Sequence, residues 1–275
     1  MTLIDEATRG DAVPRRDAGP SVLSQVARVG SVAISQVAKR YRTGATTVTA
    51  LDGINLSLRP GEFVCVVGAS GCGKSTLLNL VAGLDEPTVG RVSVDGRSSL
   101  MFQEPALFPW LTVAANIELA LKLRRVPRTE REARVADLVE LVHLTSFADR
   151  RPHELSGGMR QRVALARALA QDADVLLMDE PFGALDAMTR DVLHDELERI
   201  WRQTGVTVLF VTHNVREAAR LADRIVLLTS RPGRVAAEFE VDISRPRRIE
   251  SPDVAALAVT VTDRLREEVA RHGHR

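Results

Sequence analysis

Gly68-Ala69-Ser70-Gly71-Cys72-Gly73-Lys74-Ser75-Thr76 matches the pattern G-x-x-x-x-G-K-[ST] of a phosphate-binding P-loop, and this stretch decides the fold class of the chain. The apolar run Phe63–Val67 before it is typical of a buried strand, and residues 77–81 after it are typical of a helix. Strand, Gly-rich loop and helix form the context that the motif requires. The glycines let backbone N–H groups converge on phosphate oxygens, and the helix N-terminus adds positive potential.

The P-loop pattern assigns roles to individual residues. We expect Lys74 to reach the β- and γ-phosphates of a nucleotide and Ser75 to ligate Mg²⁺. The alternative, an ordinary Gly-rich turn, is disfavoured because the bare pattern arises by chance in roughly one chain in a hundred of this length. The residues expected to contact the nucleotide are Gly68, Ser70, Gly71, Cys72, Gly73, Lys74, Ser75 and Thr76.

Composition and charge argue against several classes of protein. The 275 residues are 45% hydrophobic and 27% charged, which is ordinary for a globular protein, and the net charge of +1 gives no sign of a nucleic-acid partner. Cys65 and Cys72 lie in the strand and loop of the motif, where a disulfide is not expected, so a reducing cytosol fits them. No apolar run approaches the ~18–20 residues that span a bilayer, and the N-terminus lacks the apolar core of a secretory signal.

The order of patterns along the chain predicts an α/β fold. Alternating apolar residues from 31 to 58 indicate half-buried strands, and strands alternate with helices from 175 to 228, which implies a largely parallel sheet. Helical periodicity at 129–143 and 159–171 marks an inserted helical subdomain at about 104–170. Ser251-Pro252 is typical of a helix start, which predicts a C-terminal helix at 251–275. The polar residues 1–30 predict a mobile tail.

A second motif ends the apolar strand at 175–178 with two carboxylates, Asp179 and Glu180. Ligands of open parallel sheets bind at the carboxyl ends of strands, where the P-loop also lies. Asp179 is therefore expected to hold Mg²⁺, and Glu180 to polarise an attacking water as general base. The alternative for such a pair alone is a solvated strand end.

A third motif, Leu155-Ser156-Gly157-Gly158-Met159-Arg160-Gln161-Arg162, opens a helix with a serine and two glycines. Free N–H groups at a helix start form a second anion site. The P-loop already covers one side of the γ-phosphate, so this second site must approach from the opposite side, most simply from another copy of the chain. A well-capped helix without a ligand is the alternative for Ser-Gly-Gly alone.

With these motifs the chain resembles the ATP-binding subunit of ATP-binding cassette (ABC) transporters over residues 31–240. Tyr41 resembles the aromatic residue that stacks on adenine, and Gln103 the glutamine that touches Mg²⁺ and senses the γ-phosphate. Ala184-Leu185-Asp186 resembles the loop that crosses the dimer interface, and His213 the switch histidine that contacts the γ-phosphate.

This resemblance implies an ATPase with a RecA-like P-loop core, an antiparallel β subdomain and the helical insert, all within an ABC ATPase domain at 31–250. It implies a homodimer that sandwiches two ATP molecules, with catalytic roles for Glu180, His213, Lys74 and Gln103. The expected Mg²⁺ ligands are Ser75, Gln103 and Asp179. It also implies membrane permease subunits bound through the helical subdomain, an indirect link to a solute-binding protein, and a peripheral location on the cytoplasmic face of the membrane.

A finer resemblance links residues 102–110 and 230–234 to subunits that import nitrate, taurine, sulfonates and related anions. Phe108 and Trp110 either pack in the core or lie beside the groove for a permease helix. Asn214 departs from the aspartate that commonly follows the switch histidine, and the short segment 95–100 indicates a trimmed hairpin. A free-standing ABC ATPase, a P-loop kinase, a non-hydrolysing binding module and an export subunit remain as rivals.

Overall fold

The computed structural model describes residues 29–44 and 46–272. Most of the predicted tail therefore lies outside the described residues. Gly30 is already buried, and its N–H donates to the carbonyl of Asp174 at 3.3 Å, so the folded part of the chain begins before Ser31.

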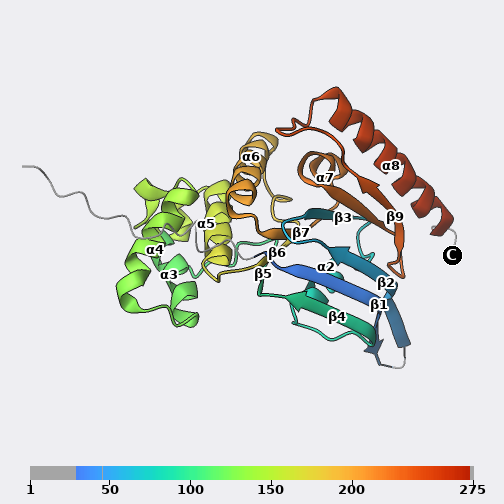
Figure 1. Ribbon diagram of the computed structural model, residues 1–275, viewed down its shortest axis with the longest axis horizontal. Helices are drawn as coiled ribbons and strands as arrows, with labels where there is room; N and C mark the ends of the chain where they lie inside the picture. The colour runs from blue at the N-terminus through green and yellow to red at the C-terminus, as the bar shows by residue number, and fades with distance from the viewer. Residues whose placement is uncertain (1–28, 45, 273–275) are drawn as a thin grey trace, which may run out of the picture.

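The described strands form two sheets (Figure 1). The smaller sheet is antiparallel and has the order β2-β1-β4, with bounds β1 (Ser31–Thr43), β2 (Thr46–Leu58) and β4 (Val89–Asp95). The larger sheet has the order β5-β6-β7-β3-β8-β9, in which only β9 runs antiparallel to its neighbour. Its strands are β3 (Phe63–Val67), β5 (Ser98–Met101), β6 (Val175–Asp179), β7 (Thr207–Thr212), β8 (Arg224–Leu228) and β9 (Val235–Glu240).

The central strand β3 is buried on both faces, as its continuous apolar run predicts. Phe63, Cys65 and Val67 point into one core, and Val64 and Val66 point into the other. Side chains alternate across a strand, so one short run of sequence supplies both cores. β3 pairs in parallel with β7 and β8, which places its carboxyl end, and the P-loop that follows, in the middle of the sheet.

Helices cover both faces of the larger sheet (Figure 1). On one side α2 (Lys74–Val81) packs between the two sheets. On the other side lie α6 (Ala187–Thr204), α7 (Val215–Leu221) and α8 (Pro252–His272), with α8 packed on α7. This layering is the α/β architecture that the order of sequence patterns predicts.

A group of helices lies at one end of the molecule, beyond β5 (Figure 1). It consists of α3 (Val113–Leu123), α4 (Arg128–Leu141), α5 (Gly157–Leu169) and two short 3₁₀ turns at Thr145–Phe147 and Pro152–Glu154. The helices predicted at 129–143 and 159–171 correspond to α4 and α5, each within two residues at either end. Asn116, buried in α3, ties this group to the preceding loop through its bonds to the N–H and C=O of Phe108.

Two further features bear on the predictions. The strand β9 was not anticipated, because its half-exposed residues give little hydrophobic periodicity. The predicted C-terminal helix is present as α8, and Val254, Ala258 and Val261 form its buried stripe. Within residues 29–44 and 46–272, no helix combines the length and hydropathy that crossing a bilayer requires.

Candidate active site

The P-loop adopts the backbone that its glycines permit. Gly71 and Gly73 have φ angles of +75° and +102°, a left-handed region that favours glycine. A Cβ on Gly73 would lie 2.6 Å from Leu51 Cδ2 and 2.9 Å from the carbonyl of Ala50. The loop therefore excludes any side chain at this position, both by conformation and by space.

Lys74 begins α2 and turns its side chain back over the loop. Its Nζ donates to the carbonyl oxygens of Gly68 at 2.9 Å and Ala69 at 3.2 Å, and the side chain is 6% exposed. The ammonium group is thus held inside the loop, where the phosphates of a nucleotide are expected.

Cys72 contributes packing to the loop. Its Sγ lies 2.7 Å from the position that a Cβ on Gly68 would take, and burial raises the pKa of the thiol. The side chain is buried, so the nucleotide contact predicted for Cys72 can involve only its backbone.

Asp179 lies at the carboxyl end of β6 and contacts the P-loop side of the site. Burial raises the pKa of its carboxyl, and the hydrogen bond with Ser75 lowers it. A serine hydroxyl beside a carboxylate, with phosphate oxygens near, is a donor set that suits Mg²⁺, which takes few ligands from the protein. Within the described ranges, no cluster of three or more His, Cys, Asp or Glu residues could hold a metal on its own.

Glu180 has a strained backbone and a fixed side chain. Its φ is +44°, unusual for a residue with a side chain, and its N–H donates to the carbonyl of Val211 at 2.9 Å. The carboxylate lies between two of the predicted partners: Oε2 is 2.9 Å from His213 Nδ1, and Oε1 is 3.8 Å from Lys74 Nζ. The structure thus brings Lys74, Glu180 and His213 into one site.

Gln103 joins this group from the segment after β5. Its Nε2 lies 3.5 Å from the position that a Cβ on Gly183 would occupy, and Glu180 Oε2 lies 3.8 Å from the same point. The carbonyl of Gln103 also accepts a hydrogen bond of 2.9 Å from Gln161 Nε2, in the third motif. Gly183, which the sequence analysis did not select, therefore lies beside both the Gln103 amide and the Glu180 carboxylate.

The third motif and the segment around Asp186 form a separate group. Ser156 caps α5 by accepting from the N–H of Met159 at 3.2 Å, and Asp186 caps α6 by accepting from Thr189 at 3.0 Å. Hydrogen bonds from Thr189 lower the pKa of Asp186. A Cβ on Gly158 would lie only 2.5 Å from Thr189 Cγ2, so the two helix starts are in close contact.

In the described part of the chain, Ser156, Gly157 and Gly158 at the start of the third motif do not bond to the P-loop side of the site, although Gln161 of the same motif bonds to the carbonyl of Gln103. Among the described residues, no hydrogen bond or ion pair connects Ser156, Gly157 or Gly158 to Lys74 or Glu180. This separation is what a site completed by a second copy requires.

Tyr41 lies on β1 and is 38% exposed. Its hydroxyl donates to Asp85 Oδ2 at 3.0 Å, and Lys39 Nζ lies 5.0 Å from the ring centroid. The hydrogen bond from Lys39 lowers the pKa of the Asp85 carboxyl. The ring is therefore anchored at the surface, and its contact with adenine stays a prediction.

Two further residues lie at the edge of the site, and the sequence did not predict their contacts. Arg231 Nε donates to the carbonyl of Gly71 at 3.4 Å, which places a cation at the outer edge of the P-loop. Asn214 accepts from the N–H groups of Arg216 at 3.1 Å and Glu217 at 3.3 Å and so caps α7. The expected aspartate has the same acceptor, so Asn214 preserves the turn after His213.

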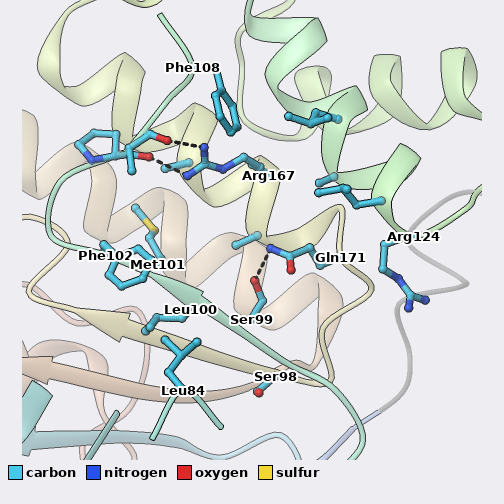
Figure 2. Close-up of a pocket in the computed structure, with 17 residues that line it drawn as sticks. Leu84, Ser98, Ser99, Leu100, Met101, Phe102, Phe108, Arg124, Arg167 and Gln171 are labelled. Carbon is cyan, nitrogen blue, oxygen red and sulfur yellow. Dashed lines mark hydrogen bonds between the residues drawn. The ribbon is translucent and has the colours of Figure 1, made fainter. Parts of the chain in front are cut away.

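An apolar groove of about 540 Å³ lies between the larger sheet and the helical group (Figure 2). Arg167 lines it and donates to the carbonyls of Pro105 at 2.8 Å and Ala106 at 2.7 Å, and Gln171 donates to Ser99 at 2.9 Å. Burial lowers the pKa of the Arg167 guanidinium. Four large apolar side chains that line the groove remain exposed: Leu84, Phe102, Phe108 and Leu123.

Comparison with known proteins agrees with this geometry. The model of the ABC transporter family matches residues 51–183. The uncharacterized ABC transporter ATP-binding protein MJ0412 of Methanocaldococcus jannaschii is 43% identical over 86% of this chain and 92% of its own length. The taurine import ATP-binding protein TauB of Burkholderia pseudomallei is 48% identical over 76% of this chain and 84% of its own. The bicarbonate transport ATP-binding protein CmpC of Synechococcus elongatus is 49% identical over 79% of this chain but 34% of its own length.

Among solved structures, the dimer of the ATP-binding cassette MJ0796 bound to ADP and Pi, in a post-hydrolysis state, is 34% identical. It aligns with a TM-score of 0.69 over 78% of this chain and all of its own. The predicted P-loop fold class is thereby confirmed. The chain belongs to the ABC transporter family, as one of its ATP-binding and ATP-hydrolysing subunits.

Proposed function

We propose that this subunit powers the import of a small solute such as taurine, bicarbonate, nitrate or a sulfonate. The observation that carries the ATPase half of the proposal is the Glu180 carboxylate, fixed between His213 Nδ1 and Lys74 Nζ at the end of β6. The solute class is supported by the relatives named for taurine import and bicarbonate transport. The solute half of the proposal is therefore an analogy with these relatives.

The site residues divide the work of phosphoryl transfer. The P-loop N–H groups and Lys74 hold the β- and γ-phosphates, and Gln103 orients the water beside Glu180. Glu180 accepts the proton of the attacking water, while His213 keeps the carboxylate in place and contacts the γ-phosphate. Ser75 and Asp179, with Gln103, would hold Mg²⁺, which neutralises charge on the phosphate oxygens when bound.

The complete site requires two copies of the chain. Ser156, Gly157 and Gly158 of the second copy would close on the γ-phosphate with the N-terminus of α5, while Asp186 lies at the interface. A two-fold axis makes the two sites identical. MJ0796, whose solved structure is a dimer bound to ADP and Pi, supports this arrangement. Loss of the γ-phosphate then weakens the dimer and moves the helical groups apart.

The groove between the larger sheet and the helical group is the proposed docking site for the permease. Exposed Leu84, Phe102, Phe108 and Leu123 offer an apolar surface of the kind that marks protein contacts. Gln103 is in the segment that enters this groove, so a helix seated there would follow the state of the ATP site. Docking there places the cassette on the cytoplasmic face of the membrane, and the link to a solute-binding protein is indirect.

A complementation experiment tests the two-copy site. Lys74→Ala and Ser156→Arg should each abolish hydrolysis, the first by losing ATP binding and the second with binding intact. Mixing equal amounts of the two proteins should restore up to about one quarter of wild-type activity, because random pairing makes half of the dimers mixed and each mixed dimer has one intact site. No recovery with demonstrated mixed dimers would refute the shared site.

Glu180→Gln should slow phosphate release by ~10²-fold or more while the ATP-bound dimer persists.

A second experiment tests the docking surface. Leu123 is 77% exposed at the groove, and Val259 is 60% exposed on α8. Leu123→Glu should remove co-purification of a multi-spanning permease from detergent-solubilised membranes, whereas Val259→Glu should retain it. Equal recovery of the permease with both variants would contradict docking at the groove, and a soluble protein as the only partner would favour a free-standing ATPase.

A further inference from the structure

A buried polar network lies beneath the switch histidine. The hydroxyl of Thr212, the residue before His213, donates to Glu217 Oε2, and Glu217 Oε1 lies 2.7 Å from His194 Nε2. Thr212, His194 and Glu217 are at most 4% exposed. Buried polar groups persist only when they are paired, so this network fixes the relative positions of β7, α7 and α6.

Thr212 connects the network to the turn that carries His213. Its Oγ accepts a hydrogen bond of 3.0 Å from the N–H of Asn214, and the hydroxyl hydrogen goes to Glu217. Of the residues on both sides of His213, Thr212 is thus bonded directly to the buried Glu217 carboxylate, and Asn214 is linked to it through the Thr212 hydroxyl. A displacement of Glu217 would move the backbone of His213 and, with it, the bond from Nδ1 to Glu180.

The neighbours of His194 determine its tautomer. Nδ1 lies 3.2 Å from Arg220 NH1, and a guanidinium can only donate, so Nδ1 must accept. The hydrogen then sits on Nε2 and is donated to Glu217. Arg220 is itself held by Asp191 at 3.3 Å and Asp195 at 2.5 Å, both on the helix that carries His194.

His194 also contacts the other side of the reaction centre. Its ring packs edge-on against Phe182, with centroids 5.4 Å apart and planes at 69°. Phe182 follows Glu180 by two residues, and its carbonyl accepts from Arg190 Nε at 3.3 Å. One imidazole therefore contacts the segment that carries Glu180 directly and the turn that carries His213 through Glu217.

We propose that His194 is a positioning residue for ATP hydrolysis: through Glu217 and Thr212 it keeps His213 within hydrogen-bond distance of Glu180. The inference rests on the proposed role of His213 at the γ-phosphate. His194 does not reach ATP, so its removal acts on the rate of the chemical step and leaves the binding of ATP at the P-loop unchanged.

Two substitutions of His194 separate hydrogen bonding from packing. His194→Leu removes the donor to Glu217 and the acceptor for Arg220, whereas His194→Gln can supply both. We expect the leucine variant to lower kcat by at least about tenfold, with KM for ATP changed less than twofold, because a small displacement of a reacting group is sufficient for such losses. The glutamine variant should restore most of kcat.

A spectroscopic measurement reports on His213 directly. In ¹⁵N-histidine-labelled protein, with the His213 signals identified by their loss in His213→Ala, the Nδ1 shift of His213 should move in His194→Leu and return in His194→Gln. Thr212→Val, which keeps the shape of the side chain, should give the same loss of kcat and the same shift change. Thr204→Val is the matched control. Thr204 lies on α6, the helix that carries His194, and its buried hydroxyl donates to the carbonyl of Ile200, outside the network.

The outcomes discriminate between the two proposals. Normal turnover in His213→Ala would overturn the proposed role of His213 itself. Loss of turnover in His213→Ala, with normal kcat and an unmoved His213 signal in folded His194→Leu and Thr212→Val, would overturn the role of His194 alone. Equal damage by glutamine and leucine would overturn the hydrogen-bonding account. If His194→Leu does not fold, Thr212→Val decides by the same two readouts.

Discussion

Replacing Gly158 with alanine tests the packing between the third motif and the segment after Asp186. The new Cβ would lie 2.5 Å from Thr189 Cγ2, a distance at which one of the two groups must shift. Overpacking of this kind lowers the free energy of unfolding by roughly 1–3 kcal/mol. Rotation of Thr189 away from the clash would instead break its hydrogen bond to Asp186, a loss of about 1 kcal/mol. We therefore expect the melting temperature without nucleotide to fall by roughly 2–12 °C.

A second-site substitution identifies the partner in this contact. Thr189→Ser removes only the Cγ2 methyl and keeps the hydroxyl, so Gly158→Ala/Thr189→Ser should melt close to Thr189→Ser alone. Circular dichroism of the four proteins, without ATP, gives the interaction free energy as a double-mutant cycle. An unchanged melting temperature in Gly158→Ala, or no recovery in the double variant, would refute the packing argument. If the double variant recovers the melting temperature but still does not hydrolyse ATP, the remaining defect lies at the proposed phosphate contact of Gly158.

Three other predictions concern separate parts of the site. Asp179→Asn should raise the melting temperature at neutral pH, because the pKa of Asp179 is raised above its ordinary 3.8 and its ionised form therefore opposes folding. The gain in melting temperature should vanish as pH falls toward 3.8, and a gain that does not depend on pH would contradict this reasoning. Tyr41→Ala should weaken ATP binding by roughly tenfold through lost stacking on adenine, whereas Tyr41→Phe should keep the affinity although it lacks the bond to Asp85. Equal affinities of Tyr41→Ala and the wild type in equilibrium binding would exclude stacking. Asn214→Asp should leave hydrolysis and stability nearly unchanged, whereas Asn214→Ala should lose about 1 kcal/mol of unfolding free energy with the α7 cap, as denaturant titration can measure.

The sequence was informative where chemistry is local. The P-loop backbone, the apolar run of β3 and the helix start at Ser156 each depend on a few consecutive residues, and a single chain shows them directly. The placement of the P-loop beside Asp179 and Glu180 follows from a rule of topology, because the carboxyl ends of parallel strands in one sheet meet at the same edge.

Contacts between distant segments could not be predicted. Glu217 and His194 are separated by 23 residues, and nothing in the letters of α6 and α7 shows that their side chains meet. The same holds for Arg231 beside Gly71, which are 160 residues apart. Strand β9 was missed for a different reason: as a half-exposed edge strand it lacks the clear alternation that marks a buried one.

The 2.9 Å bond from Gln161 to the carbonyl of Gln103 has a consequence for the proposed dimer. In that dimer Gln103 would contact the ATP bound by its own chain, whereas the helix that carries Gln161 would face the ATP bound by the other. The Gln161 amide would then link the surroundings of the two nucleotides, and a movement of Gln103 at one ATP would shift a residue near the other. Each hydrolysis event would therefore change the surroundings of the second site, although either site could carry out the chemistry by itself.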